Sequence, residues 1–236
     1  MKPFSPFLVQ TIHELQELEC FDSFALVGGT NLALRFYHRV SVDIDLFSNK
    51  PHSVDDFKRI YATLKGRFNH NIVDATLRNG DNDRKVTMQF FIQNNNESVK
   101  VDLIQNVQRI NDVEILDGIK MVSVKDVGVL KLKTISQRTN RKDIYDLDRI
   151  TDDMPLIELF EALKLKNEKF KDYQFQSPLD LQSNSCPSIT PESLLTFKHH
   201  DLKDSIEVFE NNKSWTEAEI SWTEKVEEFL SHDTTS

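Results

Sequence analysis

The 236-residue sequence has little cysteine, and its two cysteines, Cys20 and Cys186, lie far apart. Two distant cysteines do not form the disulfide framework of a small secreted domain. No apolar run approaches the roughly 20 residues that a membrane helix needs, and the first residues lack the apolar core of a secretory signal. We therefore expect a protein of the reducing cytoplasm that has no membrane partner.

An excess of positive charge is also missing. The 38 acidic residues outnumber the 29 basic ones, which gives a formal net charge of −9. This balance argues against nucleic-acid binding over the whole surface but allows a local basic groove. Residues 131–142 hold five Lys and Arg and no acidic residue, whereas residues 201–236 hold ten acidic residues against three Lys. We expect polyanions to be drawn to residues 131–142.

Several common catalytic signatures are absent. The seven His residues have no metal-ligand spacing to Cys or to each other, which argues against a zinc site. The sequence contains no G-x-S-x-G elbow, no P-loop and no Cys–His pair. Interpretations as a hydrolase or a P-loop enzyme therefore lack support.

The most informative stretch is residues 24–47, F-A-L-V-G-G-T-N-L-A-L-R-F-Y-H-R-V-S-V-D-I-D-L-F. An apolar run, two glycines, a helical pattern from Thr30 and an alternating run predict strand, glycine turn, helix and strand. Gly28 and Gly29 allow positive φ and close approach of the backbone to a ligand, and the first N–H groups of the helix bind anions. The segment therefore predicts an anion-binding turn.

Period-2 alternation in the second strand places Ser41, Asp43 and Asp45 on one face. The residues between them, Val42, Ile44 and Leu46, then face the core. Two carboxylates held side by side repel each other unless a cation lies between them, and hard oxygen ligands suit Mg²⁺ that carries a nucleoside triphosphate. The open face of this strand is thus a candidate metal site.

Asp102 is the third candidate metal ligand. In residues 99–104 the apolar side chains face one way, and Asp102 faces the other way with Lys100. If this strand lies beside the Asp43–Asp45 strand, three carboxylates converge and two metal ions can bind, with Asp102 as ligand or general base. The competing interpretation is that Asp102 is a solvent-facing residue of an ordinary strand.

The remaining periodicities predict an α+β fold. Three further strand-like runs are separated by polar, Asn-rich turns and lie at residues 71–77, 86–92 and 99–104. Together with the two strands of residues 24–47 they predict a sheet of about five strands. After about residue 118 the strand signals fade, and an apolar stripe that includes Trp215 and Phe229 predicts one amphipathic helix near the end.

The combination of Gly-Gly, thirteen intervening residues and Asp-x-Asp resembles the first motif of DNA polymerase β-like nucleotidyltransferases. The fuller pattern G-G-T-x-L-A-L…H-R-x-S-x-D-I-D-L-F resembles the AbiEii/AbiGii family of nucleotidyltransferase toxins. The resemblance implies a nucleotidyltransferase core of mixed sheet and flanking helices over residues 1–120. A mostly helical region over residues 121–236 would complete the active site.

Residues 131–147 resemble the later motifs of that family, a helical Lys, an Arg seven residues on and then Lys-Asp-x-x-Asp-Leu. The resemblance implies that Lys131 holds the triphosphate and that Asp146 is the late acidic residue essential to the site. On one helix Lys131 and Arg138 share a face, which makes Arg138 a further nucleotide-binding candidate. Against this, Lys and Arg on helices usually form a solvated face.

Four nucleotide-binding candidates come from the first motif: Gly28, Gly29, Thr30 and Ser41. Thr30 has two possible roles, as the N-cap of the helix or as a phosphate contact. The resemblance places the Ser41 hydroxyl close to the nucleotide.

For function, the resemblance implies a Mg²⁺-dependent enzyme that moves a nucleoside monophosphate from a nucleoside triphosphate to an acceptor and releases pyrophosphate. It implies the toxin of a toxin–antitoxin or abortive-infection pair, with a cognate antitoxin as partner. RNA is the expected acceptor, tRNA first, and a protein hydroxyl comes second.

Two alternatives remain open. One is a nucleotidyltransferase for small molecules such as aminoglycosides, since those enzymes share the glycine and Asp-x-Asp motif. The other is a non-catalytic nucleotide-binding or interaction module. Retention of Asp43, Asp45, Asp102 and Lys131 together speaks against the second alternative.

Overall fold

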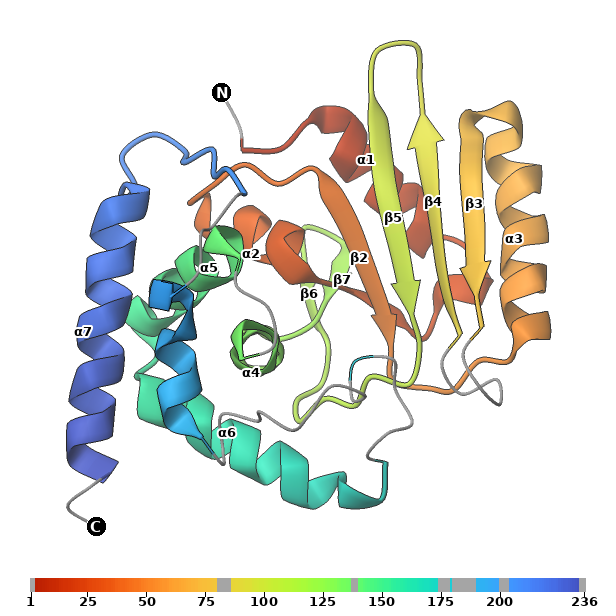
Figure 1. Cartoon of the computed structure of the whole chain (residues 1–236). Helices are drawn as coiled ribbons and strands as arrows, with labels where there is room; N and C mark the ends of the chain where they lie inside the picture. Colours follow the sequence, from red (N-terminus) through yellow and green to blue (C-terminus); the bar gives the residue numbers. More distant parts are fainter. Residues whose placement is uncertain are drawn as a thin grey trace.

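A seven-stranded mixed sheet forms the centre of the molecule, with helices packed on it (Figure 1). The computed structural model describes residues 3–79, 86–136, 140–173, 179, 190–199 and 204–233. The strands are β1 (Phe24–Val27), β2 (Asp43–Ser48), β3 (Ile72–Arg78), β4 (Thr87–Gln93), β5 (Ser98–Ile104), β6 (Glu114–Leu116) and β7 (Ile119–Met121). The α-helices are α1 (Pro6–Gln16), α2 (Gly28–Phe36), α3 (Val54–Phe68), α4 (Val124–Ile135), α5 (Arg141–Asp153), α6 (Leu156–Lys169) and α7 (Trp215–Asp233).

The strand order is β3-β4-β5-β2-β1-β7-β6. β2 lies in the middle, parallel to β5 and antiparallel to β1, and β1 is parallel to β7. The segment predicted as strand, glycine turn, helix and strand thus supplies the two strands nearest the centre of the sheet. The Asp-x-Asp strand β2 therefore has a paired strand on each side, β5 and β1.

The prediction of about five strands is wrong, because β6 and β7 add a hairpin at the edge of the sheet. Its turn is Asp117-Gly118, where both residues have positive φ, 48° and 78°. Such a turn is typical of tight hairpins, but strands of three residues are too short to show an alternating pattern. The Asp-Gly pair was therefore the only local signal of this hairpin.

Local capping signals agree well with the structure. α3 begins with a capping box, in which the Ser53 hydroxyl accepts from the Asp56 N–H and the Asp56 carboxylate accepts from the Ser53 N–H. Ser123 caps α4 by accepting a hydrogen bond from the Asp126 N–H at 3.1 Å. Between β4 and β5, the Asn94 side chain accepts from the N–H groups of the predicted turn. Each of these contacts satisfies backbone donors that the element itself leaves free.

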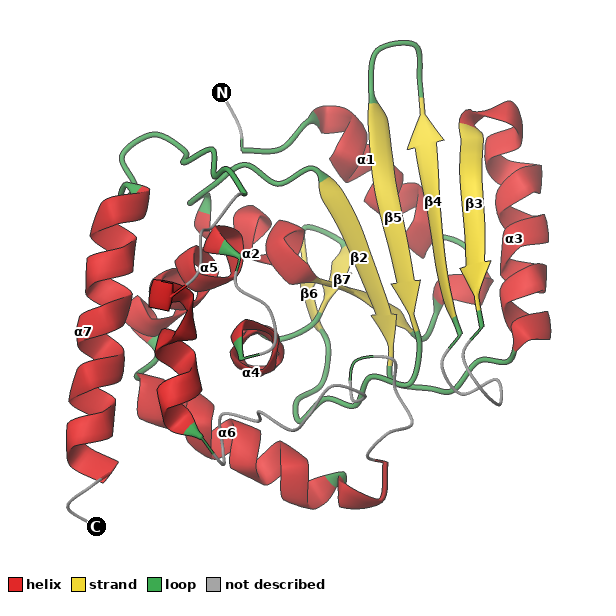
Figure 2. Cartoon of the chain, in the orientation of Figure 1, coloured by secondary structure: helices red, strands yellow, loops and turns green. Residues whose placement is uncertain are grey.

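Two hydrophobic clusters cover the two faces of the sheet. One packs α1 and α3 on the strands, and the other packs α2 and α4–α7 on β1. β1 joins them, because Phe24 and Leu26 belong to the first cluster while Ala25 and Val27 belong to the second. Figure 2 shows the long strands on one side and most of the helices grouped on the other. The division near residue 120 stays a prediction.

The last helix is held by both apolar packing and charge. Its predicted stripe is confirmed: Ala218, Trp222, Val226 and Phe229 are buried. Lys213, just before α7, and Lys225 within it both form ion pairs with acidic residues of α5, Asp148 and Asp152. α7 therefore docks on α5 rather than extending away from the core. Within the described ranges, no helix is long and apolar enough to span a membrane.

Candidate functional site

The carboxylates predicted as metal ligands lie on neighbouring strands. In the parallel pairing of β2 with β5, Asp45 is opposite Asp102 and Asp43 is opposite Lys100. Residues opposite each other in a sheet point to the same face, so Asp45 and Asp102 lie side by side. Asp43 is exposed, while Asp45 and Asp102 are partly buried. The adjacency on which the prediction for Asp102 depended is therefore present.

Electrostatics at this point of the sheet favour a bound cation. Burial, followed by the negative charges of Asp102 and Asp43, raises the pKa of Asp45 to about 6. Three carboxylates supply the hard oxygen ligands that Mg²⁺ prefers, so the donor set fits this ion. As the side chains stand, however, no group of three or more His, Cys, Asp or Glu residues in the described ranges is arranged to hold a metal.

Lys100 binds one of the three carboxylates. Its Nζ lies 2.5 Å from Oδ2 of Asp102. Burial lowers the pKa of Lys100, but the hydrogen bond and charge of Asp102 outweigh this and raise it, so the ammonium stays charged. In this arrangement a cation of the chain itself compensates part of the negative charge on the open face of β2 and β5.

The two glycines are needed because side chains of the site approach them closely. Gly28 has a φ of 68°, and a Cβ on it would lie 2.1 Å from Oδ2 of Asp45. A Cβ on Gly29 would lie 2.1 Å from Nη2 of Arg39. The predicted positive φ is confirmed for Gly28, and α2 begins there, two residues earlier than expected. The turn therefore brings the start of α2 against the Asp45 carboxylate.

Thr30 and Ser41 connect the helix start to the approach of β2. The Thr30 hydroxyl donates to the Asp43 carbonyl and lies 2.8 Å from the Ser41 hydroxyl. Val27 occupies the N-cap of α2 and makes no side-chain cap, so the interpretation of Thr30 as the helix cap is wrong. Val42 was expected in the core but is 59% exposed, because β2 begins only at Asp43 and the alternation does not extend back to it.

A buried network of charged groups surrounds Asp146, which is fully buried. Arg39 donates to both of its carboxylate oxygens, from Nε and Nη2, each at 2.7 Å. His38 Nε2 lies 2.7 Å from Oδ1, and Lys131 Nζ lies 2.7 Å from Oδ2. Lys131 also donates to Asp143 at 2.8 Å. Two cationic and two anionic side chains thus balance one another inside the protein, as a buried ion-pair network requires.

The pKa shifts follow from this balance. Burial alone would raise the pKa of Asp146, but the charges of Arg39 and Lys131 hold it well below its usual range. Burial also lowers the pKa of His38, which outweighs its hydrogen bond to Asp146. The carboxylates Asp143 and Asp146 overcome the effect of burial and raise the pKa of Lys131. Asp146 and Lys131 are therefore charged, and His38 is neutral at pH 7.

The structure places Lys131 between this network and the carboxylates of the sheet. Its ammonium binds Asp143 and Asp146. Its positive charge also offsets part of the rise in the pKa of Asp45. The role of Lys131 in holding a triphosphate stays a prediction. Its proposed companion Arg138 lies outside the described residues, and α4 ends at Ile135.

Sequence reasoning missed His38 and Arg39 as parts of the site, although both belong to the quoted motif. Arg39 is separated from Asp146 by 107 positions, so no local pattern could connect the two. Asp143 belongs to the Lys-Asp-x-x-Asp-Leu motif, but it was not predicted as a site residue. The sequence offered one signal: His38 and Arg39 stand next to each other shortly before the Asp-x-Asp strand, within the quoted motif.

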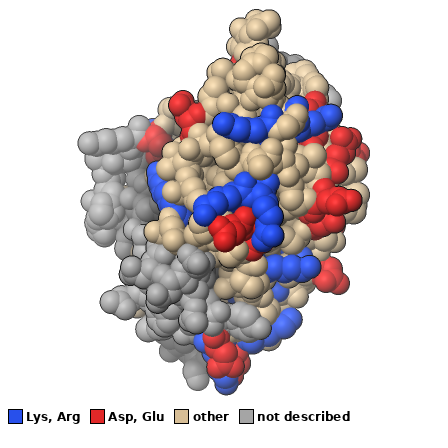
Figure 3. Space-filling view, turned by 90° about the vertical axis from the view of Figure 1, so that its right-hand side faces the viewer, with Lys and Arg blue, Asp and Glu red and all other residues tan. Residues whose placement is uncertain are grey.

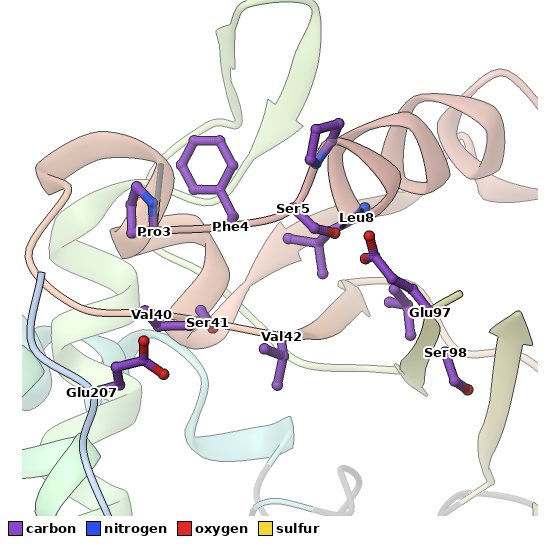
Figure 4. A pocket seen from close by; sticks show the side chains of 12 residues that line it. Pro3, Phe4, Ser5, Leu8, Val40, Ser41, Val42, Glu97, Ser98 and Glu207 are labelled. Carbon is purple, nitrogen blue, oxygen red and sulfur yellow. Dashed lines mark hydrogen bonds between the residues drawn. The ribbon is translucent and has the colours of Figure 1, made fainter. Parts of the chain in front are cut away.

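A cavity of about 630 Å³ lies beside Ser41 but not among the carboxylates. Figure 4 shows Val42 between Glu207 and Glu97, which lie at opposite ends of the cavity. Its lining includes Leu8 and Val99, which belong to the hydrophobic cluster under α1, and none of the three carboxylates. The cavity therefore opens toward the α1 side of the sheet, away from the candidate metal ligands.

Comparisons with known proteins agree with this geometry. The family described as nucleotidyl transferase AbiEii toxin, type IV TA system, matches residues 13–235. An uncharacterized protein of Aquifex aeolicus (strain VF5) is 27% identical over 225 residues, which are 94% of this chain and 95% of that protein. The solved structure of MenT4, a nucleotidyltransferase toxin from Mycobacterium tuberculosis H37Rv, has a similar fold. Its TM-score is 0.57 at 14% identity, over 92% of this chain and 80% of that one.

The family match covers nearly the whole chain, and it includes the glycine turn, the paired carboxylates and the buried network. The chain therefore belongs to the AbiEii family of nucleotidyltransferase toxins.

Proposed function

We propose that this nucleotidyltransferase toxin uses Mg²⁺ to transfer a nucleoside monophosphate from a nucleoside triphosphate to RNA, with tRNA as the first candidate. The observation that carries the proposal is the register of β2 and β5, which sets Asp45 beside Asp102 next to the glycine turn. Side-by-side carboxylates with a raised pKa are costly for a fold and are typical of functional sites. Nucleotidyl transfer, the activity of the family, would account for the paired carboxylates as metal ligands.

Asp43, Asp45 and Asp102 are the residues that would hold the metal. Bound there, Mg²⁺ would neutralise the triphosphate and activate the acceptor hydroxyl. The first N–H groups of α2, which begins at Gly28 beside Asp45, are free to donate to phosphate oxygens. Asp102 can also accept the proton of the acceptor hydroxyl, because its side chain is 26% exposed and so open to an acceptor.

The buried network has a supporting role in this proposal. Arg39 lies against Gly29 and is fixed by both oxygens of Asp146, so it ties the glycine turn to α5. Lys131 connects α4 to the same carboxylate. A site held from three elements keeps its groups in place during the reaction, which is what phosphoryl transfer mainly requires of the protein.

The case for RNA rests on charge. Lys131 is neutralised by Asp143 and Asp146, so the positive charge available from residues 131–142 comes from the remaining Lys and Arg, including the exposed Lys142. On the face around α3, Figure 3 shows Lys and Arg intermingled with Asp and Glu, and two such pairs are Lys58–Asp55 and Arg59–Asp56. The described Lys and Arg of that face form no continuous basic surface, which favours the α4–α5 side for an RNA backbone.

An antitoxin partner and a cytoplasmic location complete the proposal, because the family is one of type IV toxin–antitoxin systems.

The second candidate function is transfer to an aminoglycoside, which is cationic and would favour an acidic cleft over a basic segment.

The deciding experiment offers radiolabelled nucleoside triphosphates and Mg²⁺ together with RNA, a protein extract or aminoglycosides in parallel. We expect label in small RNA, and no label with Asp45→Asn. Arg141→Glu with Lys142→Glu should weaken RNA labelling more than triphosphate binding, and high salt should weaken it further. The matched control is Lys58→Glu with Lys65→Glu on α3, which makes the same charge change on another face.

Label on the aminoglycoside alone would establish the second candidate. Equal losses in the two charge-reversal variants would contradict the assignment of RNA to the α4–α5 side. Absence of label on every acceptor, with triphosphate binding intact, would favour a non-catalytic binding module.

A further inference from the structure

Lys100 is the one cationic side chain that the strand register places directly among the candidate metal ligands. It is opposite Asp43 on β2 and two residues before Asp102 on its own strand, so it shares their face of the sheet. Its Nζ lies 2.5 Å from Oδ2 of Asp102, and the two side chains are 33% and 26% exposed. The ion pair is thus accessible from solution while it occupies the oxygen that a metal would need.

We propose that Lys100 is a tethered cation that competes with the divalent metal for Asp102 and thereby sets the metal affinity of the site. This inference rests on the proposed metal site and concerns a residue to which neither the family resemblance nor the proposed mechanism gives a role. Lys100 is a positioning residue here, because it acts on the reaction through Asp102.

The competition follows from distance. A Mg²⁺ ion binds a carboxylate oxygen at about 2.0–2.1 Å. An ammonium 2.5 Å from that same oxygen would then be a second cation in close contact with the metal, at strongly unfavourable Coulomb energy. Metal binding at Oδ2 of Asp102 therefore requires that Lys100 swing away. Its long, flexible stem and partial exposure allow this without any change in the strand.

The charge balance gives the same result. Asp43, Asp45 and Asp102 carry three negative charges, and the ammonium of Lys100 compensates one of them. The two charges that remain are balanced by a single divalent ion. Lys100 thus weakens the attraction of the site for a metal ion when the nucleotide is absent. A bound triphosphate adds four negative charges and so strengthens that attraction.

The test is Mn²⁺ binding without nucleotide, followed by electron paramagnetic resonance of the free ion. Lys100→Met keeps the length of the side chain and removes its charge, so we expect Mn²⁺ to bind on the order of tenfold more tightly than to the wild type. Lys100→Arg keeps the charge and should retain an affinity within about twofold of wild type. Circular dichroism and thermal unfolding verify that each variant is folded.

The control for a general charge effect is Lys58→Met on α3. Lys58 also forms an ion pair with an Asp on its own element, at 2.8 Å, but it lies on a helix rather than on β2 or β5, and its side chain is 65% exposed. This variant should bind Mn²⁺ as the wild type does. Asp45→Asn should abolish the binding and so show that the signal reports this site.

The outcomes separate this inference from the proposed function. Equal or weaker Mn²⁺ binding by Lys100→Met, with binding still lost in Asp45→Asn, would overturn the role of Lys100 and leave the metal site standing. An equal gain in Lys100→Met and Lys58→Met would also overturn it. Failure of every protein to bind Mn²⁺, or binding that survives Asp45→Asn, would overturn the metal site and this inference together.

Discussion

At the scale of single residues, the two glycines show how the chain makes room for its site. A Cβ at Gly28 would overlap the Asp45 carboxylate and would need a positive φ, which L side chains rarely adopt. A Cβ at Gly29 would overlap the Arg39 guanidinium. The glycine pair therefore accommodates two charged side chains of the protein, in addition to presenting backbone N–H groups to an anion.

The first prediction is that Gly28→Ala displaces Asp45, lowers the melting temperature and removes Mg²⁺-dependent triphosphate binding. Calorimetric titration with Mg²⁺ and a nucleoside triphosphate measures the loss. Gly66→Ala is the matched control, since a Cβ there meets nothing within 4 Å and Ala favours a helix interior by up to about 1 kcal/mol. Triphosphate binding by Gly28→Ala at the wild-type level would show that the close approach of Asp45 has no functional meaning.

A second residue-scale prediction concerns the pH dependence of stability. The folded-state pKa of Asp146 is depressed, so its contribution to stability is present above the unfolded value of about 3.9 and is lost as the pH falls toward the folded value. Asp146→Asn should lower the unfolding free energy at pH 7 by about 3–5 kcal/mol, because it removes the ion-pair partner of buried Arg39 and one of the two carboxylates that bind Lys131.

Urea unfolding at pH 7, 4 and 3 measures this effect. The difference between Asp146→Asn and the wild type should shrink below about pH 4. Asp153→Asn, an exposed member of an i,i+4 pair with Arg149, should change stability little at any pH. A constant difference across the three pH values would mean that the charge of Asp146 is not what stabilises the network.

At the scale of elements, local signals were sufficient for most of the fold. The strand-like runs at residues 86–92 and 99–104 and the apolar stripe near the end correspond to β4, β5 and α7. The strands β6 and β7 were missed, because three residues cannot establish a period. Local pattern also could not show that Arg39 and Asp146 meet, since pairing over 107 positions depends on how α5 packs.

The docking of α7 gives the element-scale prediction. Trp222 is fully buried against the cluster of α4–α6, and its Nε1 donates to the Leu194 carbonyl at 3.3 Å. Trp222→Ala should therefore lower the unfolding free energy by about 3–5 kcal/mol. Ile220→Ala on the same helix, where the side chain is 54% exposed, should have little effect. Equal urea-unfolding midpoints for the two variants would contradict the packing of α7 described above.

At the scale of the whole molecule, the fold brings the candidate site residues together from elements of both hydrophobic clusters. The carboxylates come from β2 and β5, and the cations that lie behind them come from the α2–β2 connection and α4. The sequence predicted the carboxylates because strand alternation is local. It could not predict that Lys131 is buried between two acidic residues, because burial depends on the packing of α4 against α5.

The central claim is that paired carboxylates on β2 and β5 bind the metal that carries the nucleotide. Calorimetric titration with Mg²⁺ and a nucleoside triphosphate, on the wild type and on Asp45→Asn with Asp102→Asn, tests it most directly. We predict that the double variant binds no Mg²⁺–triphosphate. Its melting temperature should equal or exceed that of the wild type, because the charge repulsion that raises the pKa of Asp45 is removed. Unchanged Mg²⁺–triphosphate binding by the folded double variant would contradict the claim.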